Sequence, residues 1–431
     1  MMRPLGWFGI VRLGLVQSAI GAIVMLATSL LNRVMVVEYA LPAALPAGLV
    51  AWHYAVQVTR PVWGHGSDGG RRRSPWIVAG LLVLGTGVML AVAAVSGFAA
   101  HAPWALPLAI GGFAMIGAGV GAAGTSLLAL LAIRVAPERR AGAAALTWIM
   151  MIAGIVVAAG VAGTMIEPYS LARLIRVVAI IAGAAIAIAT IALIGIEGRA
   201  GGAPAAPSRH VPFAVALRAM LADDAARRFT AFVFLSMFAY SMQELILEPF
   251  AGLRFGFTPG QSTKLAGVLH AGVLAGMVVV GAGGSLLPRG RVQMRHWIAA
   301  GCVASALALV GLVLAARHGA PWPLSANIAA LGVGNGIFAV SAIGAMMGLA
   351  GADGANREGM RMGVWGAAQA IAFACGGLAG AIGLDLGRAW IGSVPITFMV
   401  VFAAQAMLFL VAASFAPGGA PRPRTAVAAT A

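Results

Sequence analysis

The residues best suited to chemistry in this chain are two histidines and three glutamates that interrupt long apolar segments. A neutral imidazole such as that of His53 or His270 is a good axial ligand for a metal ion. Glu38, Glu244 and Glu248 are ionisable groups in apolar surroundings, where charge is costly and usually marks function. Because Glu244 and Glu248 are four residues apart, a helix places them on one face.

The composition around these residues is that of a membrane protein. Of 431 residues, 61% are hydrophobic and only 9% are charged, against about 45–50% apolar and about 25% charged in soluble domains. The mean hydropathy is +0.96. This composition predicts an integral membrane protein and excludes a disordered chain or a disulfide scaffold.

Apolar runs long enough to cross a bilayer recur along the whole chain. The predicted spans are 14–37, 44–63, 76–98, 104–133, 143–166, 173–196, 229–249, 263–287, 297–316, 324–350, 362–386 and 394–416. The net charge of +16 lies largely in alternate loops, so it orients the helices and gives no reason to expect nucleic acid as a partner. We expect a multi-pass protein of the inner membrane with both termini in the cytoplasm.

The chain also contains an internal repeat. The shift that places His53 on His270 also places Arg140 on Arg357 and Trp148 on Trp365, although the chain has only seven His and ten Trp. The central polar stretch is either a helix lying on the membrane surface or a solvated linker. The predicted organisation is a six-helix bundle at 1–196, a cytoplasmic linker at 197–228, a second six-helix bundle at 229–416 and a cytoplasmic tail at 417–431.

The loop after the second predicted span resembles the signature loop of the major facilitator superfamily. Gly64, Asp68, Arg72 and Arg73 match that signature. Asp68 is suited to accept hydrogen bonds from a helix N-terminus and to pair with arginine, so the loop is an inner-gate candidate; the alternative is an orientation signal only. With two parallel halves joined by a linker, the resemblance implies an all-α membrane protein of twelve transmembrane helices in two pseudo-symmetric halves.

Two segments carry a more specific resemblance. They are Leu31-Asn-Arg-Val-Met-Val-Val-Glu38, which continues to Trp76, and Met242-Gln-Glu-Leu-Ile-Leu-Glu-Pro-Phe250, which is followed by 258–265. Both segments resemble the PucC family of light-harvesting assembly proteins, historically also called the bacteriochlorophyll synthase accessory family. Arg71 departs from the family pattern, which usually has a second glycine there.

The resemblance implies an assembly factor for bacteriochlorophyll–protein complexes that binds or hands over pigment. Its expected partners are membrane lipid, pigment, and antenna polypeptides or pigment-synthesis enzymes. No cofactor is firmly implied; bacteriochlorophyll or a precursor is the expected ligand. The alternatives are a proton-coupled exporter of small molecules or lipid using Glu38, Glu244 and Glu248, and an accessory subunit of pigment synthesis. No phosphate-binding loop, Cys/His metal cluster, aspartate-rich diphosphate motif or catalytic triad is evident, so we expect no catalytic or metal site.

Within this family, His53 and His270 become candidate ligands of the pigment Mg²⁺, the alternative being that they are packing residues. The candidate intramembrane polar network is Asn32, Arg33, Glu38, Gln57, Glu244 and Glu248. We expect Arg33 to pair with one of the glutamates. The pair is then either functional, as a gate or a pigment contact, or structural, as a fixed clamp near the outer surface. We expect Pro249 to break its helix, and Glu167 and Asp385, at helix ends, to be solvated.

Overall fold

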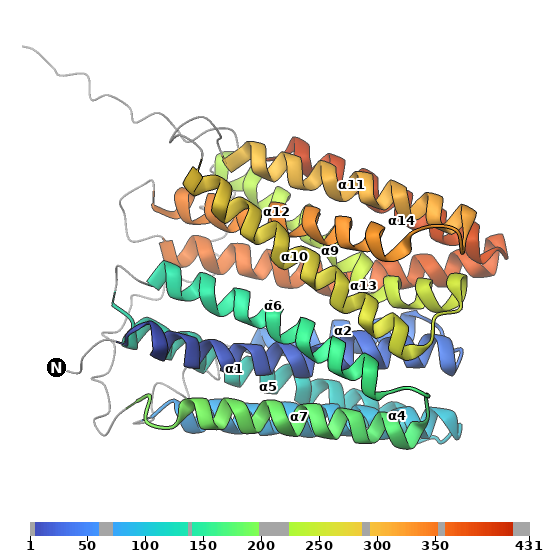
Figure 1. The fold of residues 1–431 in the computed structure, drawn as a ribbon, viewed down its shortest axis with the longest axis horizontal. Coiled ribbons are helices and arrows are strands. Elements are labelled where there is room, and N and C mark those ends of the chain that lie inside the picture. Colours follow the sequence, from blue (N-terminus) through green and yellow to red (C-terminus); the bar gives the residue numbers. More distant parts are fainter. Residues whose placement is uncertain are drawn as a thin grey trace, which may run out of the picture.

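The computed structural model describes residues 5–59, 72–136, 140–197, 224–286, 294–351 and 358–416. Within these residues the secondary structure is helical (Figure 1). Eleven of the described helices are long and apolar enough to cross a membrane, and α2 is a shorter apolar helix. The linker residues 198–223, and Gly64 and Asp68 of the predicted gate loop, lie outside the described residues.

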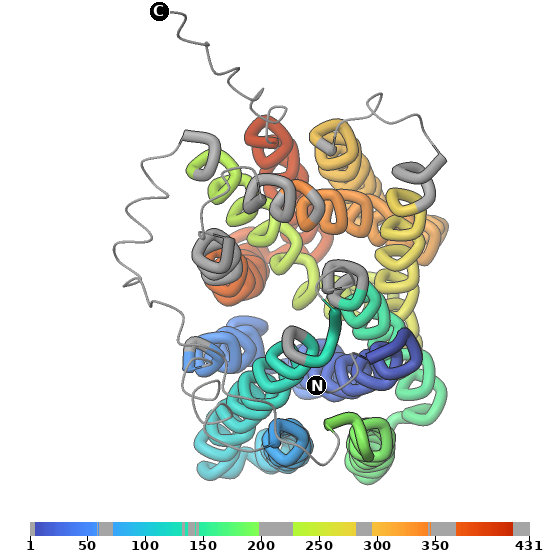
Figure 2. The backbone as a smooth tube through the Cα atoms, turned by 90° about the vertical axis from the view of Figure 1, so that its left-hand side faces the viewer, coloured from blue at the N-terminus to red at the C-terminus, as the bar shows by residue number. Residues whose placement is uncertain are grey.

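The helices form two groups, which we call the N-terminal and C-terminal halves (Figure 2). The N-terminal half contains α1 (Trp7–Met25), the π-helices η1 (Leu26–Leu31) and η2 (Val34–Glu38), α2 (Ala44–Val56), the 3-10 helix η3 (Gln57–Thr59), α4 (Ser74–Ala99), α5 (Ala105–Arg134), α6 (Arg140–Met165) and α7 (Leu171–Leu193). The C-terminal half contains α9 (Asp224–Phe255), α10 (Pro259–Leu286), α11 (Met294–His318), α12 (Leu324–Gly351), α13 (Glu358–Ile391) and α14 (Val394–Ser414). The halves meet where α6 packs on α10 and α2 packs on α13.

Close approach of the helices explains part of the high glycine content. A Cβ at Gly119 of α5 would lie 2.6 Å from the Gly80 carbonyl oxygen of α4. A Cβ at Gly336 of α12 would lie 2.0 Å from the Val273 carbonyl oxygen of α10. Membrane helices associate through such contacts because lipid provides no hydrophobic driving force between them.

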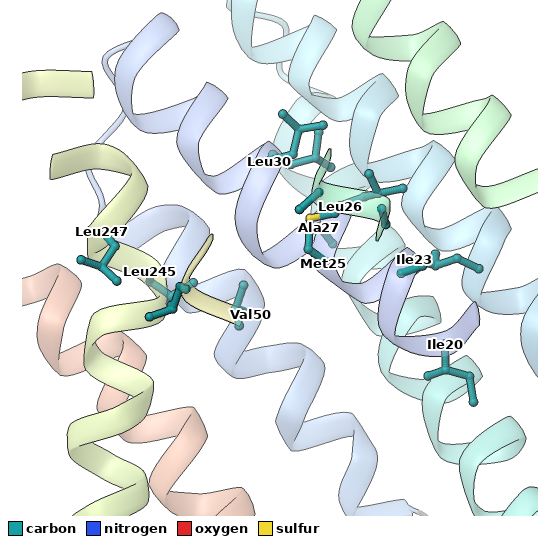
Figure 3. Packing of buried hydrophobic residues seen from close by; sticks show 14 of the residues in the cluster. Ile20, Ile23, Met25, Leu26, Ala27, Leu30, Val50, Leu245 and Leu247 are labelled. Carbon is teal, nitrogen blue, oxygen red and sulfur yellow. The ribbon is translucent and has the colours of Figure 1, made fainter. Parts of the chain in front are cut away.

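The first helix lies at the centre of the hydrophobic core. α1, η1 and η2 form one continuous span from Trp7 to Glu38. Figure 3 shows part of its packing, with Leu26 and Leu30 of the first span and Leu245 of α9 within the same buried cluster. The π-helical stretches are local widenings of the helix, which occur frequently at functional sites.

Most predicted spans match the observed helices to within a few residues, although the first helix begins at Trp7 rather than at residue 14. One error is informative. We expected a helix to end at Pro249, but α9 continues past this residue to Phe255. Proline lacks the N–H that would bond to the carbonyl oxygen of Leu245, four residues earlier. The Asn32 Nδ2 of the N-terminal half donates to this oxygen at 2.8 Å, and Asn32 is buried. The helix survives because a side chain from the other half replaces its missing hydrogen bond.

This replacement predicts a specific coupling between Asn32 and Pro249. Asn32→Leu leaves the Leu245 carbonyl without a donor, and we expect it to destabilise the protein by about 1–2 kcal/mol. In a Pro249→Ala background the same substitution should cost less, because alanine restores the N–H. Thermal unfolding of the four purified variants measures the coupling.

The matched control is Pro395→Ala, which changes a proline in the first turn of α14. A missing N–H there has no acceptor within the helix, so this substitution should not reduce the cost of Asn32→Leu. An equal cost of Asn32→Leu with and without Pro249 would mean that the asparagine does not compensate for the proline.

Candidate functional site

Hydrogen bonds between the halves gather at the end of the bundle where Glu38 lies. α1 with its π-helices, α6, α9 and α13 end there, and α2, α7, α10 and α14 begin there. We call this set of contacts the seam. Its members in the N-terminal half are Ser29, Asn32, Arg33, Ala43, Ala44 and Glu167, and those in the C-terminal half are Leu245, Glu248, Phe257, Thr258, Ser262 and Asp385.

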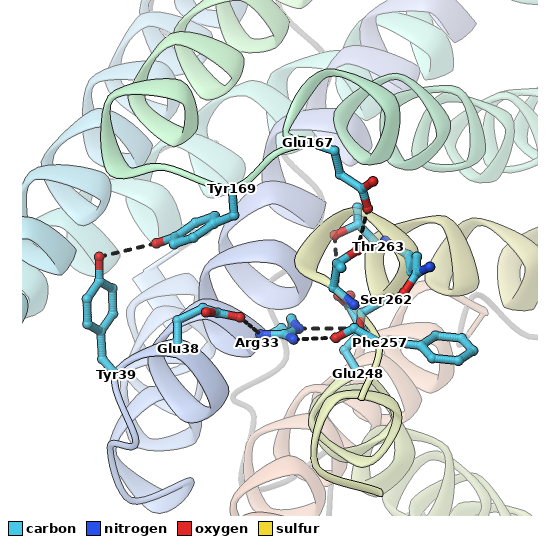
Figure 4. Close-up of polar contacts among 11 residues, drawn as sticks. Arg33, Glu38, Tyr39, Glu167, Tyr169, Glu248, Phe257, Ser262 and Thr263 are labelled. Atoms are coloured by element: carbon cyan, nitrogen blue, oxygen red, sulfur yellow. Dashed lines mark hydrogen bonds and ion pairs between the residues drawn. The ribbon is translucent and has the colours of Figure 1, made fainter. Parts of the chain in front are cut away.

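Arg33 is the central residue of the seam (Figure 4). Its side chain is 2% exposed, and its Nη1 bonds to Glu38 Oε1 at 2.7 Å. Nη2 donates to the Phe257 carbonyl oxygen at 2.7 Å, and Nε donates to Ser262 Oγ at 3.3 Å. Of the three glutamates proposed as partners, Glu38 is therefore the one that pairs with Arg33. The planar guanidinium joins this carboxylate to two groups of the opposite half.

Glu248 is held by hydroxyl groups from both halves. Its side chain is 2% exposed. Ser29 Oγ of the N-terminal half donates to Oε1, and Thr263 Oγ1 of α10 donates to Oε2 at 3.4 Å. Arg33 attracts the same carboxyl group electrostatically. Glu248 is therefore held through hydroxyl donors rather than through an ion pair.

Asp385 does not behave as a solvated helix end, so that prediction was wrong. Its two carboxylate oxygens accept hydrogen bonds from the backbone N–H groups of Ala43 at 2.9 Å and Ala44 at 2.7 Å. These groups open α2, where unpaired N–H groups and the helix dipole favour a negative charge. A residue of α13 thus caps a helix of the other half.

The end of the bundle carries two further contacts. Glu167 is exposed as predicted, yet it also accepts a hydrogen bond from Thr258 Oγ1 of the opposite half. The hydroxyls of Tyr39 and Tyr169 lie 3.2 Å apart within the N-terminal half (Figure 4). Burial raises the pKa of the Tyr169 hydroxyl above its usual range, so it remains a neutral donor or acceptor.

The two histidines related by the repeat occupy different settings. His53 is 1% exposed, its Nε2 lies 3.0 Å from the Gln57 side-chain amide, and a Cβ on Gly117 of α5 would lie 2.4 Å from its carbonyl oxygen. His270 is half-buried, and its Nδ1 lies 2.9 Å from the Ala266 carbonyl oxygen. Donation by Nδ1–H assigns the lone pair to His270 Nε2.

A group of aromatic rings between the halves was missed in the sequence. We call Tyr54, Tyr240, Phe338 and Phe373 the aromatic cluster. The Phe373 ring centroid lies 5.6 Å from that of Tyr54 and 5.7 Å from that of Tyr240, which lies 6.4 Å from that of Phe338. Glu244 adjoins the cluster, because Tyr240 hydrogen-bonds its carboxyl group. The signal was available: the chain has only four tyrosines, and two of them are in this cluster.

The described end of the predicted gate loop is anchored within the N-terminal half. Arg72 is exposed. The backbone N–H groups of Arg73 and Ser74 donate to the Glu197 carboxylate at 2.6 and 2.9 Å. The gate role of this loop stays a prediction. Among the described residues there is no group of three or more His, Cys, Asp or Glu able to hold a metal ion.

Comparison with known proteins establishes the family. The model of the PUCC protein family matches residues 30–418. The chain belongs to this family. It is 50% identical over 414 residues to the "Bacteriochlorophyll synthase 44.5 kDa chain" of Rhodobacter capsulatus, covering 96% of each chain. It is 31% identical to "Protein PucC" of the same organism, over 94% of this chain and 91% of the relative.

Solved structures identify the fold of this PUCC-family chain. A POT family transporter in complex with 5-aminolevulinic acid aligns with a TM-score of 0.71 and 14% identity, over 96% of this chain and 98% of the transporter. A bacterial homolog of the human lysosomal transporter Spinster, in an inward-facing conformation, aligns with a TM-score of 0.65 and 14% identity, over 95% of each chain. The predicted all-α fold of the major facilitator type is confirmed; the domain boundaries stay a prediction.

The geometry of Arg33 predicts that it is energetically coupled to Glu38. Arg33→Leu leaves Glu38 without its partner, and breaking a buried pair costs about 3–5 kcal/mol. Because Glu38 is 29% exposed, solvent screening should place the loss near or below the lower limit of that range. Arg33→Leu combined with Glu38→Leu should be more stable than the sum of the single effects predicts. Unfolding of the purified variants provides the measurement.

The control cycle combines Arg33→Leu with Glu197→Leu. Glu197 follows α7 and accepts hydrogen bonds from the backbone N–H groups at the start of α4, within the N-terminal half. These two effects should add. Additivity in the Arg33–Glu38 cycle as well would contradict the assigned ion pair.

Proposed function

We propose that this chain is a membrane assembly factor for bacteriochlorophyll–protein complexes, which binds pigment between its halves and passes it to a partner. Family membership supports the bacteriochlorophyll context, because a relative of 50% identity over nearly the whole chain is named for it. The two-halved fold supports a site between the halves, as in other proteins of this architecture.

The observation that carries pigment binding is the setting of His270. Its Nδ1 is engaged by the Ala266 carbonyl, and Nε2 has no hydrogen-bond partner among the described residues. Thr263, two helical turns earlier on the same face of α10, bonds to Glu248 of α9, so this face is directed into the bundle. The Mg²⁺ of a bacteriochlorophyll takes an axial nitrogen ligand of this kind. His53 fits such a role less well, because it is packed against α5 and its Nε2 contacts Gln57.

The proposed role is non-catalytic. The polar groups of the seam bond to one another across the halves, and Arg33, Glu38 and Glu248 are engaged in that way. In this proposal these groups position the helices.

The proposal includes a location and partners. The charge pattern of the loops supports an inner-membrane protein with both termini in the cytoplasm. Antenna polypeptides or pigment-synthesis enzymes are the proposed protein partners, because a hydrophobic pigment needs a donor and an acceptor within the same membrane. Membrane lipid surrounds the exposed apolar faces of the helices.

A proton-coupled exporter is the second candidate. The transporter fold and the two carboxyl groups of α9, Glu244 and Glu248, favour it. An exporter should move its substrate across vesicles in response to a pH gradient, and should purify without pigment. An assembly factor should purify with pigment and show no such flux.

The decisive test is the absorption spectrum of the gently solubilised, purified protein from a phototrophic host. We expect a bacteriochlorophyll or precursor band in the wild type. His270→Leu removes the imidazole nitrogen and should lower pigment retention severalfold, with a shifted band in the remainder. His270→Gln, which offers an oxygen ligand, should be milder.

His318→Leu is the matched control, because His318 is an exposed histidine at the end of α11 that stacks on Trp322. This variant should keep both pigment and spectrum. His53→Leu should reduce stability more than it changes the spectrum. If the His270→Leu protein is stable and its bound pigment has an unchanged spectrum, His270 is a packing residue; a wild type without pigment would contradict the proposed function.

A further inference from the structure

The aromatic cluster links the two halves near the depth of Glu244, farther from the end of the bundle than the seam. Tyr54 comes from α2 of the N-terminal half, and Phe373 and Tyr240 come from α13 and α9 of the C-terminal half. The three rings follow one another at centroid separations of 5.6 and 5.7 Å. These separations are typical of favourable aromatic pairs. The planes of neighbouring rings are tilted by 58° and 48°, so the rings form a continuous but faceted aromatic contact.

This surface is not fully covered by protein. Phe338 is completely buried, whereas Tyr54, Tyr240 and Phe373 are each half-buried, and so is Glu244. On either side of Glu244 in α9, Gln243 and the residues from Leu245 to Ala251 are buried. Between Ser241 and Ala251, Glu244 is thus the one residue that is not buried, and Tyr240, one turn earlier, shares its face of α9.

Glu244 gives this surface a polar edge. Tyr240 hydrogen-bonds its carboxyl group, and Glu244 has no ion-pair partner among the described residues. An unpaired carboxylate is costly at membrane depth. In its acid form the group has one O–H to donate, and a carbonyl oxygen is the natural acceptor for that donor in an apolar ligand.

His270 lies at nearly the same depth along the bundle as Glu244. Glu248 and Thr263 are in contact across α9 and α10. At 1.5 Å per residue, Glu244 lies about 6 Å and His270 about 10 Å from that contact along their helices. Both displacements lead away from the seam, because α9 ends and α10 begins there. The two levels differ by less than the width of a tetrapyrrole ring.

We propose that Tyr54, Tyr240 and Phe373 form the face on which the macrocycle of the bound pigment lies, with the Glu244 carboxyl donating a hydrogen bond to a carbonyl at its rim. This inference rests on the proposed function and specifies its site. Because the face is built from both halves, binding depends on their relative position. Edge and face contacts with these rings account for a conjugated ligand, and the carboxyl fixes its rotation.

The test is a titration of the purified full-length protein with bacteriochlorophyll in detergent, followed by absorption and by resonance Raman of the carbonyl stretch. Loss of one ring, in Tyr54→Leu or Tyr240→Leu, should weaken binding roughly two- to tenfold. Tyr240→Phe keeps the ring and should bind nearly as well as the wild type. Glu244→Leu should raise the carbonyl stretching frequency, whereas Glu244→Gln, which still donates, should raise it less.

Phe234→Leu is the matched control, since this α9 residue pairs with Phe238 at 5.9 Å and is outside the cluster. It should bind like the wild type. If pigment binds and His270→Leu weakens it, but the Tyr54, Tyr240 and Glu244 variants match Phe234→Leu in affinity and carbonyl frequency, the proposed function stands and this site is wrong. If the wild type does not bind pigment, both fail.

Discussion

The arrangement of the halves depends on a carbonyl group that cannot be left unpaired. Pro249 removes the donor for the buried Leu245 carbonyl oxygen in the last third of a membrane-spanning helix, where water is not available as a substitute. The Asn32 Nδ2 of the other half donates to this oxygen at 2.8 Å. Ser29 and Arg33 lie within one turn of Asn32 and bond to Glu248 and to the Phe257 carbonyl. One turn of the first span therefore fixes α9 and the start of α10 together.

The seam also determines where the halves are free to separate. Its bonds gather at the end of the bundle that contains Glu38, and Asp385 adds a helix cap across the same end. Any separation that preserves them takes place toward the opposite end. Gly252 of α9 lets Arg33 approach closely at this end, because a Cβ at this position would lie 3.0 Å from Arg33 Nη2. The aromatic cluster lies deeper in the bundle than the seam, so it is the inter-half surface that such a separation would uncover.

The sequence predicts well those features that depend on local pattern. The spans follow from hydropathy, and 76–98 and 324–350 correspond closely to α4 and α12. Arg33 and Glu248 were also singled out, because they are conspicuous in apolar runs. The roles of Pro249 and Asp385 were misjudged because the hydrogen bonds that decide them, Asn32 to the Leu245 carbonyl and Ala43 to Asp385, join residues more than 200 positions apart. Local pattern contains no information about such a partner, and the same holds for the ring contacts of Tyr54.

The histidines show why a repeat does not predict equivalent chemistry. Each half inherits a histidine at a matching position, but α5 approaches His53 closely at Gly117, a contact that only a residue without a side chain allows. His53 is 1% exposed, whereas His270 remains half-buried. Tyr240, Glu244 and Phe373 are also in the C-terminal half, and Tyr54 alone comes from the N-terminal half. Because the two halves pack differently, most residues of the candidate site lie in the C-terminal half, and Tyr54 of the N-terminal half completes it.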